Sequence, residues 1–485
     1  MLIANYSDFG FFNAPVSEIK WSKLVFCTIC IYFCAIAILG GCSSKSPLPF
    51  PEKPSWVALG EDAESRFGYR ACFAGDLNGS GYCALIVGAP GYDRDRGKVY
   101  VYLGGPHGLS QKPDWTFEGE APGDAFGDRV GSAGDLNGDG YGDVYVTASS
   151  WGKGQGKVYV FYGGPKGLPS RASWTAHGVG KPPLSFGDCT VPTGDLNGDG
   201  YDDLAVGAYG FDGTRGEVFV FYGSKKGLDR TAGWRVQGEA RGDQLGYGLG
   251  PAGDVNRDGY DDLIIAAKYH SEGVPQQGKA YLYEGGPKGL ATASWTALGD
   301  SKAANLGTRV YGCGDLQGGG YPDVLIGAPY AQGGKGEVLA YAGGPEGLAK
   351  SPFMRLAALD GRTGFGFCLG PLGRMGQDRE PGFFVSSRGD AGGVVDIYEY
   401  SPGQGPVLLQ SIRGSHKDDR FGMWCAPVGD IRGMGTADLC VSDDTDGPGR
   451  VEVYYGNAPD SGLKNPDAAL AYFLGNAKKQ GPRTP

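Results

Sequence analysis

Residues 126–148 read FGDRVGSAGDLNGDGYGDVYVTA, and variants of this pattern occur seven times along the chain. Each copy holds an aromatic residue or Leu followed by Gly, and nine residues later a loop that begins, in all but one copy, with aspartate. The loops start at Asp76, Asp135, Asp195, Asp254 and Asp315, with weaker copies at Arg374 and Asp430. Their spacings are 59, 60, 59, 61, 59 and 56 residues, whereas the nine-residue offset never changes. Each copy is therefore one structural unit, with insertions confined to its loops.

Each unit is expected to contain four short strands. The first runs from the Phe-Gly pair to the loop, and the second follows the loop as an apolar run, as at 203–208. The third alternates apolar and aromatic residues, as at 157–162, and the fourth carries a tryptophan at 115, 174, 234 and 295. Short apolar runs divided by Gly/Pro turns indicate an all-β fold. Because the tryptophans share one strand position, we expect them to pack between units; a carbohydrate-stacking ladder is the alternative.

The repeat predicts a seven-bladed β-propeller of four-stranded blades. A single small sheet cannot bury both faces, and seven stacked units close into a ring that protects their edges. An open solenoid is the alternative. Residues 56–60 look like a fourth strand with no unit before it, so we expect them to complete the last blade; residues 469–475 offer a second candidate. The predicted propeller covers residues 55–475, and a disordered tail covers 476–485.

Three of the loops carry a complete set of oxygen donors. In residues 135–143, carboxylate or amide oxygens occupy positions 1, 3, 5 and 9, position 7 offers its backbone carbonyl, and Gly140 at position 6 allows a sharp turn. Calcium prefers such hard oxygen ligands, although the glutamate at position 12 of an EF-hand is missing. We predict three Ca²⁺ ions, in blades two to four, with these ligands: Asp135, Asn137, Asp139, Tyr141, Asp143, Asp195, Asn197, Asp199, Tyr201, Asp203, Asp254, Asn256, Asp258, Tyr260 and Asp262. A metal-free Asn/Asp/Gly turn is the alternative.

The other four loops lack part of this set. Blade one has Ser80 and Ala84 in place of two carboxylates, and blade six begins with Arg374, whose cation would exclude calcium. Blade five carries Gln317 and Gly319, and blade seven carries Arg432 and Met434. We therefore expect no calcium in these four blades.

The first 42 residues indicate export. An apolar run at 24–39 follows Lys20 and Lys23 and ends in Gly-Gly-Cys at 40–42. The run is shorter than the roughly 20 residues of a membrane span and is typical of a secretory signal; an uncleaved anchor helix is the alternative. Its end resembles the lipobox of bacterial lipoproteins. That resemblance implies a signal peptide over 1–41, a lipid on Cys42, a flexible tether over 42–54, and anchoring to the cell envelope, at the outer membrane or cell surface.

Charge and cysteine usage give two further expectations, on nucleic acid as a partner and on disulfides. A net charge of −10 and a pI near 5.1 argue against nucleic acid, whose phosphates need a basic surface. Seven cysteines follow Cys42 without CxxC spacing, which favours buried free thiols. Cross-strand pairs Cys72–Cys83 and Cys425–Cys440 are the alternative.

At this point the motifs match a family. The Phe-Gly pair, the Gly-Asp-x-Asn-Gly-Asp-Gly-Tyr-x-Asp loop and Gly-Ala-Pro at 88–90 and 327–329 resemble FG-GAP repeats. The resemblance covers roughly residues 55–475. It implies the seven-bladed propeller of integrin α chains and of many bacterial surface proteins.

These features predict a calcium-binding surface module for adhesion or for binding an extracellular or envelope protein or glycan. We expect no enzyme, because the four histidines occupy unrelated places in the repeat and no catalytic motif is present. The alternatives are a polysaccharide lyase or hydrolase that uses the propeller channel, and a scaffold subunit of an envelope complex. The Arg-Gly-Asp tripeptide at 241–243 is interpreted as part of the repeat, since Gly-Asp recurs at 123–124, and the one at 388–390 lies where blade six has lost Gly-Ala-Pro. A direct adhesion role of these tripeptides is the alternative.

Overall fold

The computed structural model describes residues 48–457, except 360, 376–380, 390, 391, 415–419, 428 and 446. The predicted signal peptide, Cys42, the second candidate closing strand at 469–475 and the predicted tail lie outside the described residues.

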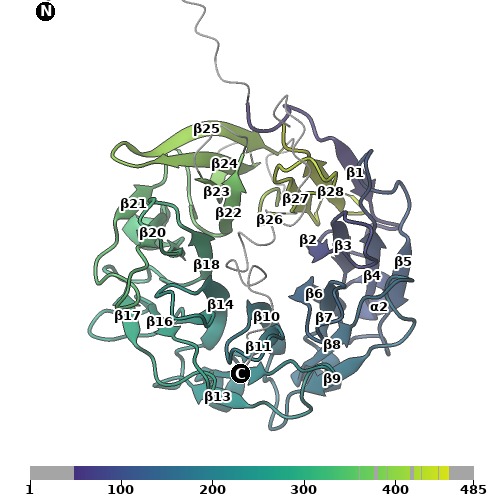
Figure 1. Ribbon diagram of the computed structural model, residues 1–485, viewed down its shortest axis with the longest axis horizontal. Helices are drawn as coiled ribbons and strands as arrows, with labels where there is room; N and C mark the ends of the chain where they lie inside the picture. Colours follow the sequence, from purple (N-terminus) through teal and green to yellow (C-terminus); the bar gives the residue numbers. More distant parts are fainter. Residues whose placement is uncertain are drawn as a thin grey trace, which may run out of the picture. The chain divides into compact units, whose positions relative to one another are not determined.

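Seven four-stranded antiparallel sheets follow one another around a ring (Figure 1). Blade one comprises β2 (Arg70–Gly75), β3 (Ala84–Ala89), β4 (Lys98–Tyr102) and β5 (Trp115–Glu118). Blade two comprises β6 (Phe126–Gly134), β7 (Asp143–Ala148), β8 (Lys157–Phe161) and β9 (Trp174–His177). Blade three comprises β10 (Phe186–Gly194), β11 (Asp203–Ala208), β12 (Glu217–Phe221) and β13 (Trp234–Gln237). Blade four comprises β14 (Leu245–Gly253), β15 (Asp262–Ala267), β16 (Lys279–Tyr283) and β17 (Trp295–Leu298).

The remaining blades keep this plan. Blade five comprises β18 (Arg309–Gly314), β19 (Asp323–Ala328), β20 (Glu337–Tyr341) and β21 (Met354–Ala357). Blade six has longer outer strands: β22 (Leu369–Arg374), β23 (Pro381–Gly389), β24 (Gly392–Ser401) and β25 (Gly405–Arg413). Blade seven comprises β26 (Trp424–Pro427), β27 (Leu439–Asp443), β28 (Arg450–Tyr454) and the N-terminal β1 (Trp56–Leu59). Four-residue turns that contain residues with left-handed φ occur at α2 (Tyr92–Asp95), α3 (Trp151–Gly154), α4 (Phe211–Thr214) and α5 (Ala331–Gly334). The predicted seven-bladed, nearly all-β propeller is confirmed.

The strands of a blade differ in burial according to their place in the ring. The first strand of each blade lies innermost and contacts the first strands of both neighbouring blades (Figure 1). The second strands of blades one to five are buried at every residue. Neighbouring blades cover both of their faces, so both faces need apolar side chains. This explains why these strands read as continuous apolar runs and do not alternate.

The tryptophans of the fourth strands join adjacent blades. The Trp174 ring lies edge-on to Phe221 of the next blade, with ring centroids 4.9 Å apart, and its Nε1–H donates to the Asp229 carbonyl at 3.0 Å. Trp295 makes the same contacts: its ring centroid lies 4.8 Å from that of Tyr341, and its Nε1–H donates to the Ala349 carbonyl at 2.9 Å. Packing between blades, which the shared strand position predicts, is thus their role; the rings are not free to form a carbohydrate ladder.

The N-terminal strand closes the ring, as predicted. β1 pairs antiparallel with β28, with Trp56 opposite Val453 and Leu59 opposite Arg450. Trp56 also makes the standard joint to blade one, since its ring lies 4.9 Å from that of Tyr102 and its Nε1–H donates to the Ser110 carbonyl at 3.1 Å. The first and last parts of the chain therefore share one sheet (Figure 1).

Pro49 and Phe50, which the prediction places in a flexible tether over 42–54, contact the propeller. The Phe50 side chain is 1% exposed and belongs to the apolar cluster between blades six and seven. Its N–H donates to the Gln410 side chain at 3.2 Å, and the N–H of Asn457 donates to the Pro49 carbonyl at 3.1 Å. The sequence does not predict this contact, because the local pattern of Leu48 and Phe50 among prolines indicates neither a strand nor a helix.

All seven cysteines of the described region are free thiols. The register places Cys72 opposite Ile86 and Cys425 opposite Val441, so neither of the two cross-strand pairs forms. Burial raises the pKa of the Cys72 thiol to about 11, which keeps it protonated at neutral pH.

Candidate calcium loops on one rim of the propeller

The predicted calcium loops connect the first and second strands of each blade and contact the blade that follows. The backbone N–H of Ser224 in blade three donates to the Leu136 carbonyl of the blade-two loop at 3.2 Å. Gly286 donates to Leu196 at 2.9 Å and Gly344 to Val255 at 3.0 Å in the same way. Each of these loops is therefore part of the joint between two blades, on the rim that also carries the turns between third and fourth strands.

Side chains at positions 1, 3 and 5 of each complete loop are tied together by hydrogen bonds. In blade three, Asp195 Oδ1 accepts from the N–H of Asp199 at 3.1 Å and Oδ2 from that of Gly200 at 2.7 Å. Asn197 accepts the same Asp199 N–H at 3.0 Å and donates its side-chain N–H to Asp199 Oδ2 at 3.0 Å. The loops of blades two and four repeat these contacts. Positions 1, 3 and 5 thus present their oxygens close together on each loop.

The aspartate at position 9 begins the second strand and is fully buried. Asp203 Oδ2 accepts the N–H of Leu196 in its own loop at 3.0 Å, and Oδ1 accepts the N–H of Gly223 after the third strand at 2.8 Å. Asp143 and Asp262 make the equivalent pairs of bonds. Burial raises the pKa of each of the three carboxyls to about 8, aided by the aspartates at positions 1 and 5 and opposed by the N–H donors. A nearby cation would stabilise the ionised form.

The tyrosines at position 7, predicted to offer only a backbone carbonyl, use their rings to cover the loop of the preceding blade. A Cβ atom on Gly198 would lie 2.5 Å from the Tyr260 ring, which explains the glycine at position 4. Asp261, next to that tyrosine, accepts the N–H of Asp195 at 2.9 Å, and Asp202 accepts that of Asp135 at 2.7 Å. Successive loops are therefore linked from blade two to blade four.

The oxygen donors of the loops in blades two to four are of the kind that calcium prefers. The three carboxylates of each loop, however, do not converge on one point. Among the described residues, the acids of a loop do not form a group whose ligand atoms all lie within 4.8 Å of one another. The hydrogen-bonded frame itself also forms in the incomplete loops, where Asp76 accepts from Ser80 and Gly81, and Asp430 accepts from Met434 and Gly435. The hydrogen-bonded frame is therefore common to complete and incomplete loops, and the full oxygen set distinguishes blades two to four.

In blade five, the structural role of the aspartate at position 9 can be tested separately from calcium binding. Asp323 accepts the N–H groups of Leu316 at 2.9 Å and Gly343 at 3.0 Å, although its loop has Gln317 and Gly319 at positions 3 and 5. Asp323→Ala leaves these N–H groups without their acceptor, and each such loss costs about 1–3 kcal/mol. We expect a free energy of unfolding lower by a few kcal/mol, equally with and without calcium, measured by urea denaturation. A loss that appears only with calcium present would contradict the structural role.

The centre of the ring holds a cavity of about 220 Å³ lined by the first strands. Arg70, Arg129 and Arg309 gather there around Trp424, and the Arg309 guanidinium lies 4.5 Å from the centre of the indole ring. Asp188 is the one carboxylate among the described lining residues, and it forms an ion pair with Arg129 at 2.6 Å. The usual mechanism of glycoside hydrolysis uses a pair of carboxylates, and the described lining residues include one.

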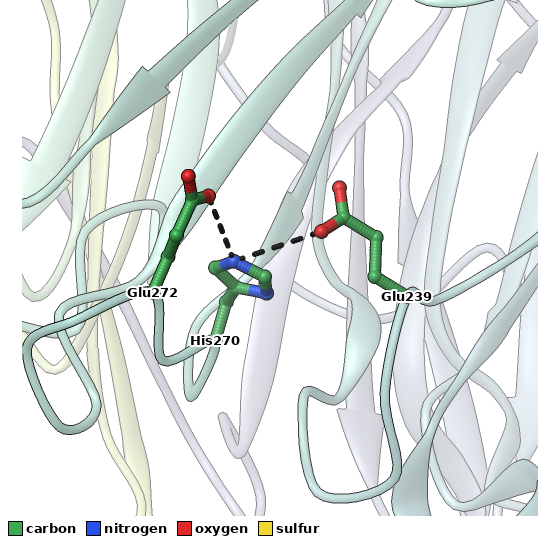
Figure 2. A group of neighbouring side chains, drawn as sticks. All are labelled: Glu239, His270 and Glu272. Carbon is green, nitrogen blue, oxygen red and sulfur yellow. Dashed lines mark ion pairs between the residues drawn. The ribbon is translucent and has the colours of Figure 1, made fainter.

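Sequence reasoning missed one cluster on the opposite rim, formed by Glu239, His270 and Glu272 (Figure 2). The available signal is the length of the connection between second and third strands. It has eight residues in four blades (90–97, 149–156, 209–216 and 329–336) but eleven in blade four (268–278). Glu272 lies in this longer connection, next to His270.

In comparison with known proteins, a family model matches the three blades whose loops carry the complete set of oxygen donors. The FG-GAP repeat model matches residues 126–161, 190–221 and 245–283, which lie in blades two, three and four. The chain is 38% identical to Integrin alpha-5 of Xenopus laevis over 167 residues, 32% of this chain and 16% of that protein. It is 31% identical to Integrin alpha-PS3 of Drosophila melanogaster over 249 residues, 49% of this chain and 21% of that protein.

Integrin alpha-V of Gallus gallus is 31% identical over 217 residues, 42% of this chain and 20% of that protein. The chain thus spans about a fifth or less of the length of these relatives. Among solved structures, the "Structure of Dos1 propeller" has a TM-score of 0.41 and 12% identity, over 80% of this chain and 77% of that chain. That likeness adds nothing to the fold, which rests on the sheet topology. The chain therefore carries FG-GAP repeats in blades two, three and four, and over part of its length it is similar to integrin α chains.

Proposed function

We propose that this protein is a calcium-binding surface module that attaches to an extracellular or envelope protein or glycan. The observation that carries the proposal is the set of three complete oxygen-donor loops, linked to one another along one rim of the ring. In the proposal each loop binds one Ca²⁺ through its side chains at positions 1, 3, 5 and 9 and the carbonyl at position 7. These are the fifteen ligands predicted above, in blades two, three and four.

Calcium would act on the joints between blades. The three loops carry clustered carboxylates, and the ionised form of their buried position-9 aspartates is disfavoured by burial. A bound cation offsets that repulsion and desolvation. Because each loop also contacts the following blade, the ion would stiffen the rim and hold the variable surface loops in place for a partner.

Binding is favoured over catalysis by the lining of the central cavity. Its one described carboxylate is paired with Arg129, and the other charged side chains of the lining are arginines. The polysaccharide-active enzyme and the envelope scaffold remain the competing proposals, and neither has a specific observation in its favour.

For location, we propose export and attachment to the envelope, at the outer membrane or cell surface, through a lipid on Cys42. The support is the apolar run at 24–39 and the lipobox-like end at 39–42. Among the described residues, no helix has the length and apolar character that crossing a membrane would require. Mass spectrometry of the mature N-terminus would test the lipid.

The function is tested by binding assays with and without calcium. Purified protein is applied to a glycan array and to an envelope extract, in 5 mM CaCl₂ or in excess chelator, beside the triple variant Asp139→Asn, Asp199→Asn, Asp258→Asn. We expect retained partners in calcium, and at least tenfold weaker retention in chelator or by the variant. Turnover of a polysaccharide, or binding equal under all conditions, would contradict the proposal.

A further inference from the structure

His270 is a buried histidine that projects between two glutamates on the rim opposite the calcium loops (Figure 2). It follows β15 in blade four and is 5% exposed. Glu272 lies in the same connection, and Glu239 follows β13 in blade three. The ligand atoms of the three side chains all lie within 4.8 Å of one another.

The hydrogen bonds of His270 fix which ring nitrogen carries the proton. Nδ1 lies 3.0 Å from Oδ2 of Asp243, an aspartate that is 4% exposed and also accepts the N–H of Ala240 at 2.9 Å. A carboxylate only accepts, so Nδ1 donates. In the neutral imidazole this leaves the Nε2 lone pair pointing at the glutamates. Nε2 is buried and makes no hydrogen bond with any described residue.

The distances around Nε2 suit a metal ion better than a proton. Nε2 lies 3.7 Å from Glu239 Oε2 and 3.5 Å from Glu272 Oε2 (Figure 2). A hydrogen bond from a protonated Nε2 would bring the nitrogen and an oxygen to about 2.7–3.2 Å. Metal–ligand bonds of about 2.0–2.2 Å in a tetrahedral site place neighbouring ligand atoms ~3.4 Å apart. Both observed separations are close to that tetrahedral edge.

The surrounding groups would support such an ion. An imidazole whose other nitrogen donates to a carboxylate is the usual arrangement behind a metal-binding histidine, and Asp243 supplies that carboxylate. Lys279 and Tyr281 donate to Glu239 Oε1, at 2.9 Å and 3.1 Å, which leaves Oε2 directed at His270. Lys279 also lies 3.2 Å from Glu272 Oε2 and would give up this second contact when a metal binds.

Other blades show what is specific to blade four. Glu120, which follows β5 of blade one, pairs with Lys157 of blade two at 2.6 Å, and its second oxygen accepts from the Trp151 indole at 3.2 Å. Trp151 is the third residue of its connection, the place that His270 occupies in blade four. The glutamate–lysine pair is therefore part of the repeat, whereas the histidine and Glu272 are additions that convert it into three converging ligands.

We propose that Glu239, His270 and Glu272 form a binding site for a transition-metal cation of the zinc type, with water completing the coordination. One imidazole and two carboxylates suit Zn²⁺ better than Ca²⁺, which prefers oxygen ligands alone. The ion links the connection after β13 to the one after β15 and so clamps blade three to blade four. The site is separate from the calcium loops and does not rest on the proposed function. It also gives Asp243 an inward role, so the Arg-Gly-Asp at 241–243 does not present its carboxylate to a partner.

The test is a zinc titration of the full chain in 10 mM CaCl₂, which keeps the calcium loops filled. Calorimetry is expected to show one Zn²⁺ per chain, and Co²⁺ in its place to give the visible absorption of a tetrahedral site. His270→Gln is expected to abolish binding, and Glu272→Gln to weaken it at least tenfold. The Glu272 side chain is 58% exposed, so this variant leaves the fold intact.

Two matched controls separate the site from adventitious binding. His177→Gln alters a histidine at the end of β9, and Glu120→Gln alters the counterpart of Glu239 that follows β5 and pairs with Lys157; neither is expected to change zinc binding. No zinc bound by the wild-type chain, or equal affinity of wild type with either site variant, would overturn the proposal. So would an Nε2-bound proton on His270 that persists, by ¹⁵N NMR, at saturating zinc.

Discussion

Replacing Trp56 by alanine is expected to lower the free energy of unfolding by about 3–5 kcal/mol, the usual cost of deleting a buried aromatic side chain. The indole is 5% exposed, packs edge-on to Tyr102 and holds the Ser110 carbonyl. It lies at the one joint where the two ends of the ring meet, in the strand that completes blade seven. Urea denaturation followed by tryptophan fluorescence measures the change.

Two comparisons make this result specific to ring closure. Val57→Ala, on the exposed face of the same strand, is expected to change stability by no more than about 0.5 kcal/mol. Deleting residues 48–61 removes the whole strand and is expected to cost more than Trp56→Ala, whereas ending the chain at residue 457 should cost little. A chain that tolerates the first deletion and not the second would show that the C-terminal candidate strand closes the ring.

The second large effect is stabilisation by calcium. A site with a dissociation constant of about 10⁻⁴–10⁻³ M, typical of extracellular calcium modules, contributes about 1.4–2.7 kcal/mol at 10 mM free calcium. Three such sites would raise the unfolding free energy by roughly 4–8 kcal/mol. We expect the denaturation midpoint of the wild-type chain to rise steeply with calcium, and to return when a chelator is added.

A variant of a calcium loop is expected to change the free energy of unfolding differently with and without calcium. Asp199→Asn removes a carboxylate ligand and also one of the mutually repelling charges of the loop. Without calcium the variant should be at least as stable as the wild type, and with calcium it should be less stable by one site's contribution. Glu118→Gln, at the exposed end of β5, should match the wild type in both conditions. A loss of stability by Asp199→Asn that is the same with and without calcium would argue for a purely structural loop.

Much of the fold is predictable because its signals are local. The constant offset between the Phe-Gly pair and the loop is a property of one hairpin, so it survives insertions elsewhere and identifies seven blades. The role of Trp56 is one of two that the sequence offers, since a fourth strand without a blade before it can complete the last blade and residues 469–475 are a second candidate. The pairing of Trp56 with Val453 confirms that inference.

What could not be predicted depends on contacts between neighbouring blades and loops. The ring of Tyr260 covers Gly198 of the preceding loop, and the carboxylate of Asp261 holds the Asp195 N–H, contacts that no spacing within one repeat reveals. Glu239 and His270 meet only because the connections after β13 and β15 lie on one rim. Phe50 gave no periodic signal, yet it fills a gap between two blades.

The central claim, that three oxygen-rich loops of the ring each hold one calcium ion, is tested most directly by counting bound ions. Equilibrium dialysis of the purified protein against millimolar ⁴⁵Ca²⁺ should give three ions per wild-type chain, two for Asp199→Asn and none for the triple variant Asp139→Asn, Asp199→Asn, Asp258→Asn. A wild-type chain that binds no calcium, or a triple variant that still binds three ions, would contradict the account.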